Sequence, residues 1–211
     1  MKKTIILLLV CLLNTALICA EQYKMAGPYK VMARDGQYRN TKGGSERDMK
    51  KALELAEAGN YKEAMRIIDA YAATLERLDG HDAPLCAIQC YDLVRAMTLV
   101  CQNGAANKQQ QDSFNGMIKR ALLPMIQKFD ADSPYANGNW GAIVNRLRMA
   151  CAICMKDSVL YKASIDYHLH ANDNGSLPMY ISETGQCQET GRDQGHVQLG
   201  LEALSQICEM A

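Results

Sequence analysis

SERDMKKALELAEAGNYKEAMRIIDAYAATLERL, residues 45–78, decides the fold class of this chain. Ser45 is followed three positions later by an acid, Asp48, which is close to the capping box that begins many helices. Apolar residues recur at helical spacing up to Gly59-Asn60, a pair that typically ends a helix. The same spacing resumes immediately and continues over residues 61–78. The stretch therefore predicts two consecutive helices joined by a short turn.

Helical spacing recurs along the rest of the chain, with polar turn-forming connections between the periodic segments. It predicts five further helices, at residues 85–101, 113–129, 140–155, 158–170 and 193–211. Pro124 predicts a kink or a split in the second of these. The one weak strand candidate is at residues 178–182. Successive helix pairs predict an all-α domain over residues 45–211, preceded by an irregular lead-in at residues 21–44.

The first twenty residues have the layout of a secretory signal peptide: two lysines, a run of Ile, Leu and Val, and small residues near Ala20. The apolar run is too short to span a membrane. Cleavage after Ala20 is expected first, which makes the protein periplasmic or secreted. Lipid attachment at Cys19 is the second alternative, because the bulky Ile18 stands where a small residue is preferred.

The charge of the chain excludes one class of partner. Removing Lys2 and Lys3 with the signal peptide leaves 21 basic against 23 acidic residues, a formal charge of −2. No basic block is present. Binding to nucleic acid by charge is therefore not expected.

Seven cysteines follow the signal peptide, and most of them lie in apolar helical patterns, where cysteine behaves as a small buried hydrophobe. They are Cys86, Cys90, Cys101, Cys151, Cys154, Cys187 and Cys208. An odd number in an exported protein leaves at least one thiol unpaired. We expect few or no disulfides.

Two sequence features that can indicate a metal site are weak here. Cys151 and Cys154 form a single CxxC inside an apolar helical run, without a second pair. His168 and His170 are two residues apart on a predicted helix, so their side chains point to different faces. We expect neither a metal nor a cofactor.

The most polar segment is GQCQETGRDQGH, residues 185–196. If a helix begins before Asp193, then Glu189, either Arg192 or Asp193, and His196 line one face. If the segment is a loop, its glycines can bring the same groups together. Either arrangement can bind a polar, anionic ligand rich in hydroxyls. The competing interpretation, which spacing alone favours, is a capping network: Asp193 caps the helix, Arg192 pairs with Glu189, and a neighbour satisfies His196.

A second candidate segment is ANGNW, residues 136–140, in which two asparagines lead into a helix that begins with the single Trp of the chain. The amides of Asn137 and Asn139 offer donors and acceptors that suit sugar hydroxyls or a carboxylate. A turn with an Asn cap is the alternative, and it is preferred when the segment is considered alone.

Taken in order, these segments resemble a known family. They are NGNW (residues 137–140), AIVNRLRMACAICM (142–155), KDSVLYKASIDYHLHANDNGSL (156–177) and GQCQETGRDQGHVQLGL (185–201). The chain is similar over about residues 30–211 to the alginate lyase superfamily domain of Bacteroidetes-type secreted polysaccharide lyases, and most similar to polysaccharide lyase family 38. The resemblance implies an (α/α) toroid, or an incomplete barrel of antiparallel helix hairpins, with a site between helix ends.

The activity that the resemblance implies is β-elimination on a uronic-acid polysaccharide, of the alginate or glucuronan type. Catalytic positions of the family match Asn139, Glu189 and His196, which would surround the uronate carboxylate or assist proton transfer. Asn137 competes with Asn139 for the asparagine role. The residues expected to contact the substrate are Asn137, Trp140, Arg192 and Gln194. The implied partner is an anionic polysaccharide.

The sequence departs from the family in two places. The His that some relatives carry in an Asn-His pair before the Trp is absent, because Ala136 and Asn137 stand there. The proton-transfer Tyr and its Arg lie well downstream of GRDQGH in the family, but the fifteen residues after His196 contain neither. We therefore expect a C-terminally incomplete lyase domain. The alternatives are a non-catalytic glycan-binding or scaffold protein of the same fold and a helical-repeat interaction module.

Overall fold

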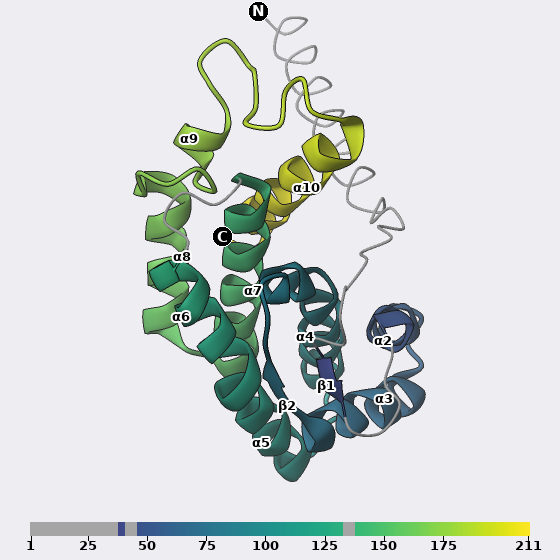
Figure 1. Ribbon diagram of the computed structural model, residues 1–211. Coiled ribbons are helices and arrows are strands. Elements are labelled where there is room, and N and C mark those ends of the chain that lie inside the picture. Colours follow the sequence, from purple (N-terminus) through teal and green to yellow (C-terminus); the bar gives the residue numbers. More distant parts are fainter. Residues whose placement is uncertain (1–37, 41–45, 133–137) are drawn as a thin grey trace, which may run out of the picture. The chain divides into compact units, whose positions relative to one another are not determined.

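Helices account for most of the chain (Figure 1), and the fold is all-α, as the sequence predicts. The computed structural model describes residues 38–40, 46–132 and 138–211, which lie within one unit, Val31–Ala211. Its elements are β1 (Tyr38–Asn40), α2 (Glu46–Glu57), α3 (Tyr61–Thr74), β2 (Leu75–Leu78), η1 (Ala83–Cys86), α4 (Ala87–Gln102), α5 (Lys108–Met117), η2 (Ile118–Leu122), α6 (Leu123–Asp132), α7 (Gly138–Met155), α8 (Ser158–His170), α9 (Leu177–Tyr180) and α10 (Gln194–Met210).

Some sequence predictions concern residues outside this description. They are the signal peptide at residues 1–20, most of the lead-in at 21–44, the Ser45 cap, and Asn137 as a site residue. These stay predictions.

Helix α7 is the central element of the described fold. It contacts α4, α8 and α10, and α2 packs against α3 and α4. Its residues from Gly138 to Ala152 are buried except for Trp140. A helix that is buried on every side belongs in a core. The polar side chains that α7 carries into this core, Asn139, Asn145, Arg146 and Arg148, are therefore the ones that need an explanation.

The predicted helix at residues 61–78 is wrong at its C-terminal end. Helix α3 stops at Thr74, and Leu75–Leu78 forms a strand that pairs with β1, in the segment predicted to be irregular. Leu75 and Leu78 are buried, so the strand faces the core. Arg120 donates hydrogen bonds to the carbonyl oxygens of Ala72 and Leu75, which satisfies groups that the helix end leaves open.

The helix predicted at residues 113–129 begins earlier and is divided. Helix α5 starts at Lys108, because Asn107 and Gln110 form a reciprocal capping box at its N-terminus. A π-helical turn, η2, then separates α5 from α6, which contains Pro124. Proline lacks the N–H of the α-helical ladder, and the sequence predicts a kink or a split here; the structure has a π-helical turn just before Pro124.

No disulfide links the seven cysteines in the described part of the chain. The stretch Ala83–Gln102 has the length and composition of a membrane-crossing helix, but 67% of its most apolar window is buried inside the protein. That degree of burial is typical of a core helix.

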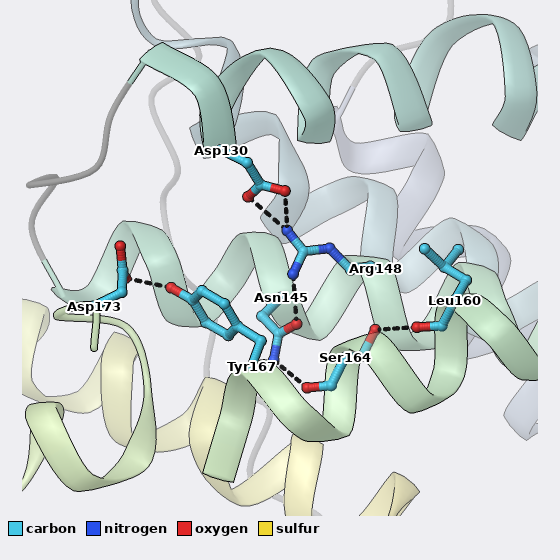
Figure 2. A network of polar contacts seen from close by, with 7 residues as sticks. All are labelled: Asp130, Asn145, Arg148, Leu160, Ser164, Tyr167 and Asp173. Atoms are coloured by element: carbon cyan, nitrogen blue, oxygen red, sulfur yellow. Dashed lines mark hydrogen bonds and ion pairs between the residues drawn. The ribbon is translucent and has the colours of Figure 1, made fainter. Parts of the chain in front are cut away.

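A polar network ties α6, α7 and α8 together (Figure 2). Arg148 donates to both carboxylate oxygens of Asp130, at 2.6 and 2.5 Å, and to Oδ1 of Asn145 at 3.1 Å. Asn145 in turn donates to the carbonyl oxygen of Ser164 at 3.1 Å. These bonds satisfy two of the four buried polar side chains of α7 and fix α8 against it.

A second polar cluster lies where α4, α7 and α10 meet. The guanidinium of Arg146 donates to Oε1 of Gln206 at 2.5 Å, lies 3.9 Å from Glu202, and stacks 4.3 Å above the centre of the Tyr91 ring. Asp92 belongs to the same cluster. Burial raises the pKa of Asp92 to about 6, since the cost of burying its charge exceeds the attraction of Arg146.

Asp92→Asn should therefore stabilise the protein at neutral and alkaline pH. The folded-state pKa lies above the unfolded one, so the ionised carboxylate destabilises the fold above about pH 6, and this cost disappears as the pH falls towards 4. We expect a gain of up to about 3 kcal/mol near pH 8 and almost none near pH 4. Urea unfolding at both pH values measures it.

The control for this experiment is Asp166→Asn, at an exposed carboxylate on α8. Its effect should be small at both pH values. A gain from Asp92→Asn that does not depend on pH would contradict the explanation.

Candidate functional site at the start of helix α7

Asn139 is the most unusual side chain in the described fold. It lies in the first turn of α7 and is 0% exposed, yet among the described residues neither its Oδ1 nor its Nδ2 has a hydrogen-bond partner. Buried amides are almost always partnered, and an unmet buried group costs about 1 to 3 kcal/mol. An unfavourable group that a sequence keeps in its core is a candidate for function.

The loop after α8 is pressed directly onto this turn. A Cβ atom at Gly175 would lie 2.5 Å from the carbonyl carbon of Gly141 and 2.7 Å from the backbone nitrogen of Ala142. The loop is held by Asp173, which accepts hydrogen bonds from the Tyr167 hydroxyl and, at 2.9 Å, from the backbone N–H of Gly175. Figure 2 shows Tyr167 reaching Asp173 from α8. Only glycines allow the two backbones to approach this closely.

Tyr180 joins the start of α7 to α10. A Cβ atom at Gly138 would lie 2.7 Å from the Tyr180 ring, and one at Gly200 would lie 1.8 Å from its hydroxyl oxygen. The side chain is 1% exposed, and its hydroxyl interacts with the Cys187 thiol but has no other hydrogen-bond partner among the described residues. Burial raises the pKa of Tyr180, and Cys187 and Glu189 raise it further, so the hydroxyl stays protonated and can donate.

Sequence reasoning did not single out Tyr180, and the weak strand candidate at residues 178–182 is extended only in part. Leu177–Tyr180 is a helical turn, α9, and extended structure begins only at Ile181, which bridges Cys187. The backbone N–H of Gln188 then donates to the carbonyl oxygen of Tyr180 at 2.9 Å. This small hairpin returns the chain to Tyr180 and brings Glu189 close to it.

The capping interpretation of residues 185–196 is confirmed. Asp193 accepts from the backbone N–H of His196 at 3.0 Å, and its other oxygen lies 2.5 Å from Nδ1 of His196. Hydrogen bonds from the backbone and then the ring of His196 lower the pKa of Asp193. Arg192 pairs with Glu189 at 3.1 Å. A helix that starts before Asp193 is wrong, because α10 begins at Gln194 and Gly191 has a φ of +90°.

Tyr180 lies near two of the three predicted catalytic residues. Asn139 follows Gly138, which the Tyr180 ring contacts. Glu189 is 4% exposed and close enough to raise the pKa of Tyr180. His196 lies one helical turn before Gly200, the glycine that the Tyr180 hydroxyl contacts. Asn139 and Glu189 therefore both lie near Tyr180 and are buried, whereas His196 is partly exposed and its ring contacts Asp193.

The residues predicted to contact the substrate differ in their exposure to solvent and in their partners. Trp140 is partly buried, and its ring lies 5.8 Å from the ring of His81, an exposed residue that sequence reasoning also missed. Arg192 is 43% exposed and engaged with Glu189, while Gln194 is exposed in the first turn of α10. Asn137 lies outside the described residues.

The chemistry that this arrangement offers is that of hydrogen bonding to a polar ligand. The amide of Asn139 and the hydroxyl of Tyr180 are neutral donors, and His196 has one ring nitrogen, Nε2, that Asp193 does not engage. Among the described residues, no group of three or more His, Cys, Asp or Glu side chains is arranged to hold a metal ion.

Comparisons with known proteins do not assign a function to this chain. No protein-family model matches the chain, no curated protein matches it, and no solved structure matches it. The family resemblance of its segments therefore remains an expectation, and functional inference rests on the residues around Asn139 and Tyr180.

Proposed function

We propose that this protein is a polysaccharide lyase that cleaves a uronic-acid polymer, of the alginate or glucuronan type, by β-elimination. The observation that carries the proposal is the buried amide of Asn139, which has no hydrogen-bond partner among the described residues and directly follows Gly138, the glycine against which the buried ring of Tyr180 packs. The ordered resemblance of NGNW and GQCQETGRDQGH to such lyases supports the same assignment. We further propose the toroid of helix hairpins and the periplasmic or secreted location that this family and the N-terminal sequence imply.

The reaction requires the carboxylate of the uronate to be neutralised, because its C5 proton is otherwise weakly acidic. Asn139 and Tyr180 can supply this effect by donating hydrogen bonds to the carboxylate, most strongly when charge develops in the enolate-like intermediate. Both side chains are fully buried, so the substrate carboxylate reaches them only when the residues that cover them move apart. Asn139 lies in the first turn of α7, where the helix dipole also favours a negative charge.

His196 is the candidate base. Its Nδ1 is held by Asp193 at 2.5 Å, which fixes the tautomer that leaves Nε2 able to accept a proton. Transfer of the C5 proton to Nε2 breaks the C–H bond, forms the C4–C5 double bond and expels the 4-linked sugar oxygen. That oxygen takes a proton from the imidazolium or from solvent. Glu189, paired with Arg192, orients the loop beside Tyr180, and its carboxylate can accept a hydrogen bond from a sugar hydroxyl.

A non-catalytic glycan-binding protein is the second candidate, and one observation favours it. Glu189, Arg192, Asp193 and His196 already satisfy one another in a local capping network. Such a network needs no substrate to explain it. In this alternative, Asn139 and Tyr180 still bind a sugar, but no proton is transferred.

The deciding experiment follows the ultraviolet absorbance of the unsaturated product on alginate, polyglucuronate and neutral polymers. We expect a signal with at least one uronate polymer and none with a neutral one. His196→Gln should lower kcat by about a hundredfold or more, as expected for loss of a general base. The matched control is His170→Gln, at an exposed histidine on α8, which should leave kcat unchanged.

The outcomes separate the two candidates. Retained binding of uronate oligomers with no elimination by the wild-type protein would favour the glycan-binding alternative. Elimination that His196→Gln leaves intact would remove His196 from the mechanism.

A further inference from the structure

Cys208 and His168 form a thiol–imidazole pair on the side of α10 that faces α8. The Cys208 sulfur lies 3.4 Å from Nε2 of His168, within hydrogen-bond distance for sulfur. The imidazole is 2% exposed, and its Nδ1 has no partner among the described residues. The thiol is therefore the one group to which this buried ring is seen to hydrogen-bond.

Cys208 differs from the other cysteines of the described chain in its access to solvent. It is exposed, whereas Cys86, Cys90 and Cys151 are buried and the remaining three are partly buried. Burial raises the pKa of four of those thiols, namely Cys90, Cys101, Cys151 and Cys154. A thiolate is the reactive form of cysteine, so these four are poor nucleophiles.

We propose that Cys208 is a modification site, at which the thiol exchanges with small-molecule disulfides while His168 accepts its proton. The site is separate from the residues around Asn139 and Tyr180, and it does not depend on the proposed lyase activity.

The exchange removes one proton from the thiol and transfers one half of the disulfide to Cys208. The S–H proton of Cys208 moves to Nε2 of His168 as the sulfur attacks one sulfur of the disulfide. A new bond joins Cys208 to that sulfur, the old disulfide bond breaks, and the second half leaves as a thiolate that takes up a proton. Burial lowers the pKa of His168, so at neutral pH the ring is uncharged and can accept the proton.

The test uses dithiodipyridine in less than stoichiometric amount on the folded protein. The release of thiopyridone gives the rate, and peptide mass spectrometry gives the labelled cysteine. We expect most of the first label on Cys208, loss of the fast phase in Cys208→Ser, and a rate at least about tenfold lower in His168→Gln. His170→Gln, on the same helix but exposed, is the matched control and should react like the wild type.

Two results would overturn the proposal: a first label on another cysteine, or an unchanged rate in His168→Gln. In denaturant, wild type and His168→Gln should be labelled at equal rates. That result would show that the slower labelling of the variant depends on the contact between Cys208 and His168 in the folded protein. If His168→Gln does not fold, the labelled position in the wild type decides the matter alone.

Discussion

Replacing Asn139 by leucine is expected to raise the free energy of unfolding by about 1 to 2 kcal/mol and to abolish elimination. The amide is fully buried with neither polar atom bonded, and leucine has nearly its shape without its unmet hydrogen bonds. A residue whose removal strengthens the fold and destroys activity is one that function retains. Urea unfolding and the ultraviolet assay measure the two effects.

The matched control for this substitution is on the same helix. Asn145 is 1% exposed, but its Nδ2 donates to Ser164 and its Oδ1 accepts from Arg148. Asn145→Leu leaves both partners buried and unmet, so it should destabilise the protein by about 2 to 3 kcal/mol. If the two substitutions destabilise equally, Asn139 is a structural residue and the candidate site loses its main support.

An alanine in place of Gly175 is expected to cost about 3 kcal/mol or more. Its Cβ would meet three backbone atoms of Gly141 and Ala142 at 2.5 to 2.7 Å, and backbone cannot rotate away as a side chain can. The loop must therefore leave the first turn of α7, which also displaces the neighbours of Asn139. Denaturant unfolding gives the loss, and the lyase assay should show reduced activity.

Gly116→Ala is the control for this prediction. At Gly116, the second-last residue of α5 and followed directly by the helical turn η2, an added Cβ meets only the end of the Arg120 side chain at 3.7 Å. Alanine should stabilise that helix by about 0.5 to 1 kcal/mol. A loss below about 1 kcal/mol for Gly175→Ala would contradict the close packing described for the loop.

Features that depend on neighbours in sequence were predictable. The bounds of α8 at residues 158–170 match, because Asp157 caps it locally, at 3.0 and 2.9 Å from the N–H groups of Val159 and Leu160. The contacts of Asp193 with His196 and of Arg192 with Glu189 were also predictable, since both are three residues apart. The start of α5 was missed although Asn107 and Gln110 carry a readable capping signal.

Features that depend on distant contacts were not predictable. Helical periodicity continues past Thr74, but pairing with β1 and capping by Arg120, some 45 residues away, end α3 there. The role of Tyr180 depends on glycines from α7 and α10 that no spacing connects. Asn139 was predicted from a family motif, whereas its lack of partners depends on the packing of the whole core.

The most direct test of the account is the binding of a saturated uronate oligosaccharide, measured by isothermal titration calorimetry on wild type and Asn139→Leu. We predict saturable binding to the wild-type protein and an affinity at least about tenfold lower in the variant, as expected when a buried donor to a charged group is lost. Equal affinities in the two proteins, or no binding of any uronate oligomer to the wild type, would contradict the assignment of a uronate site to the start of α7.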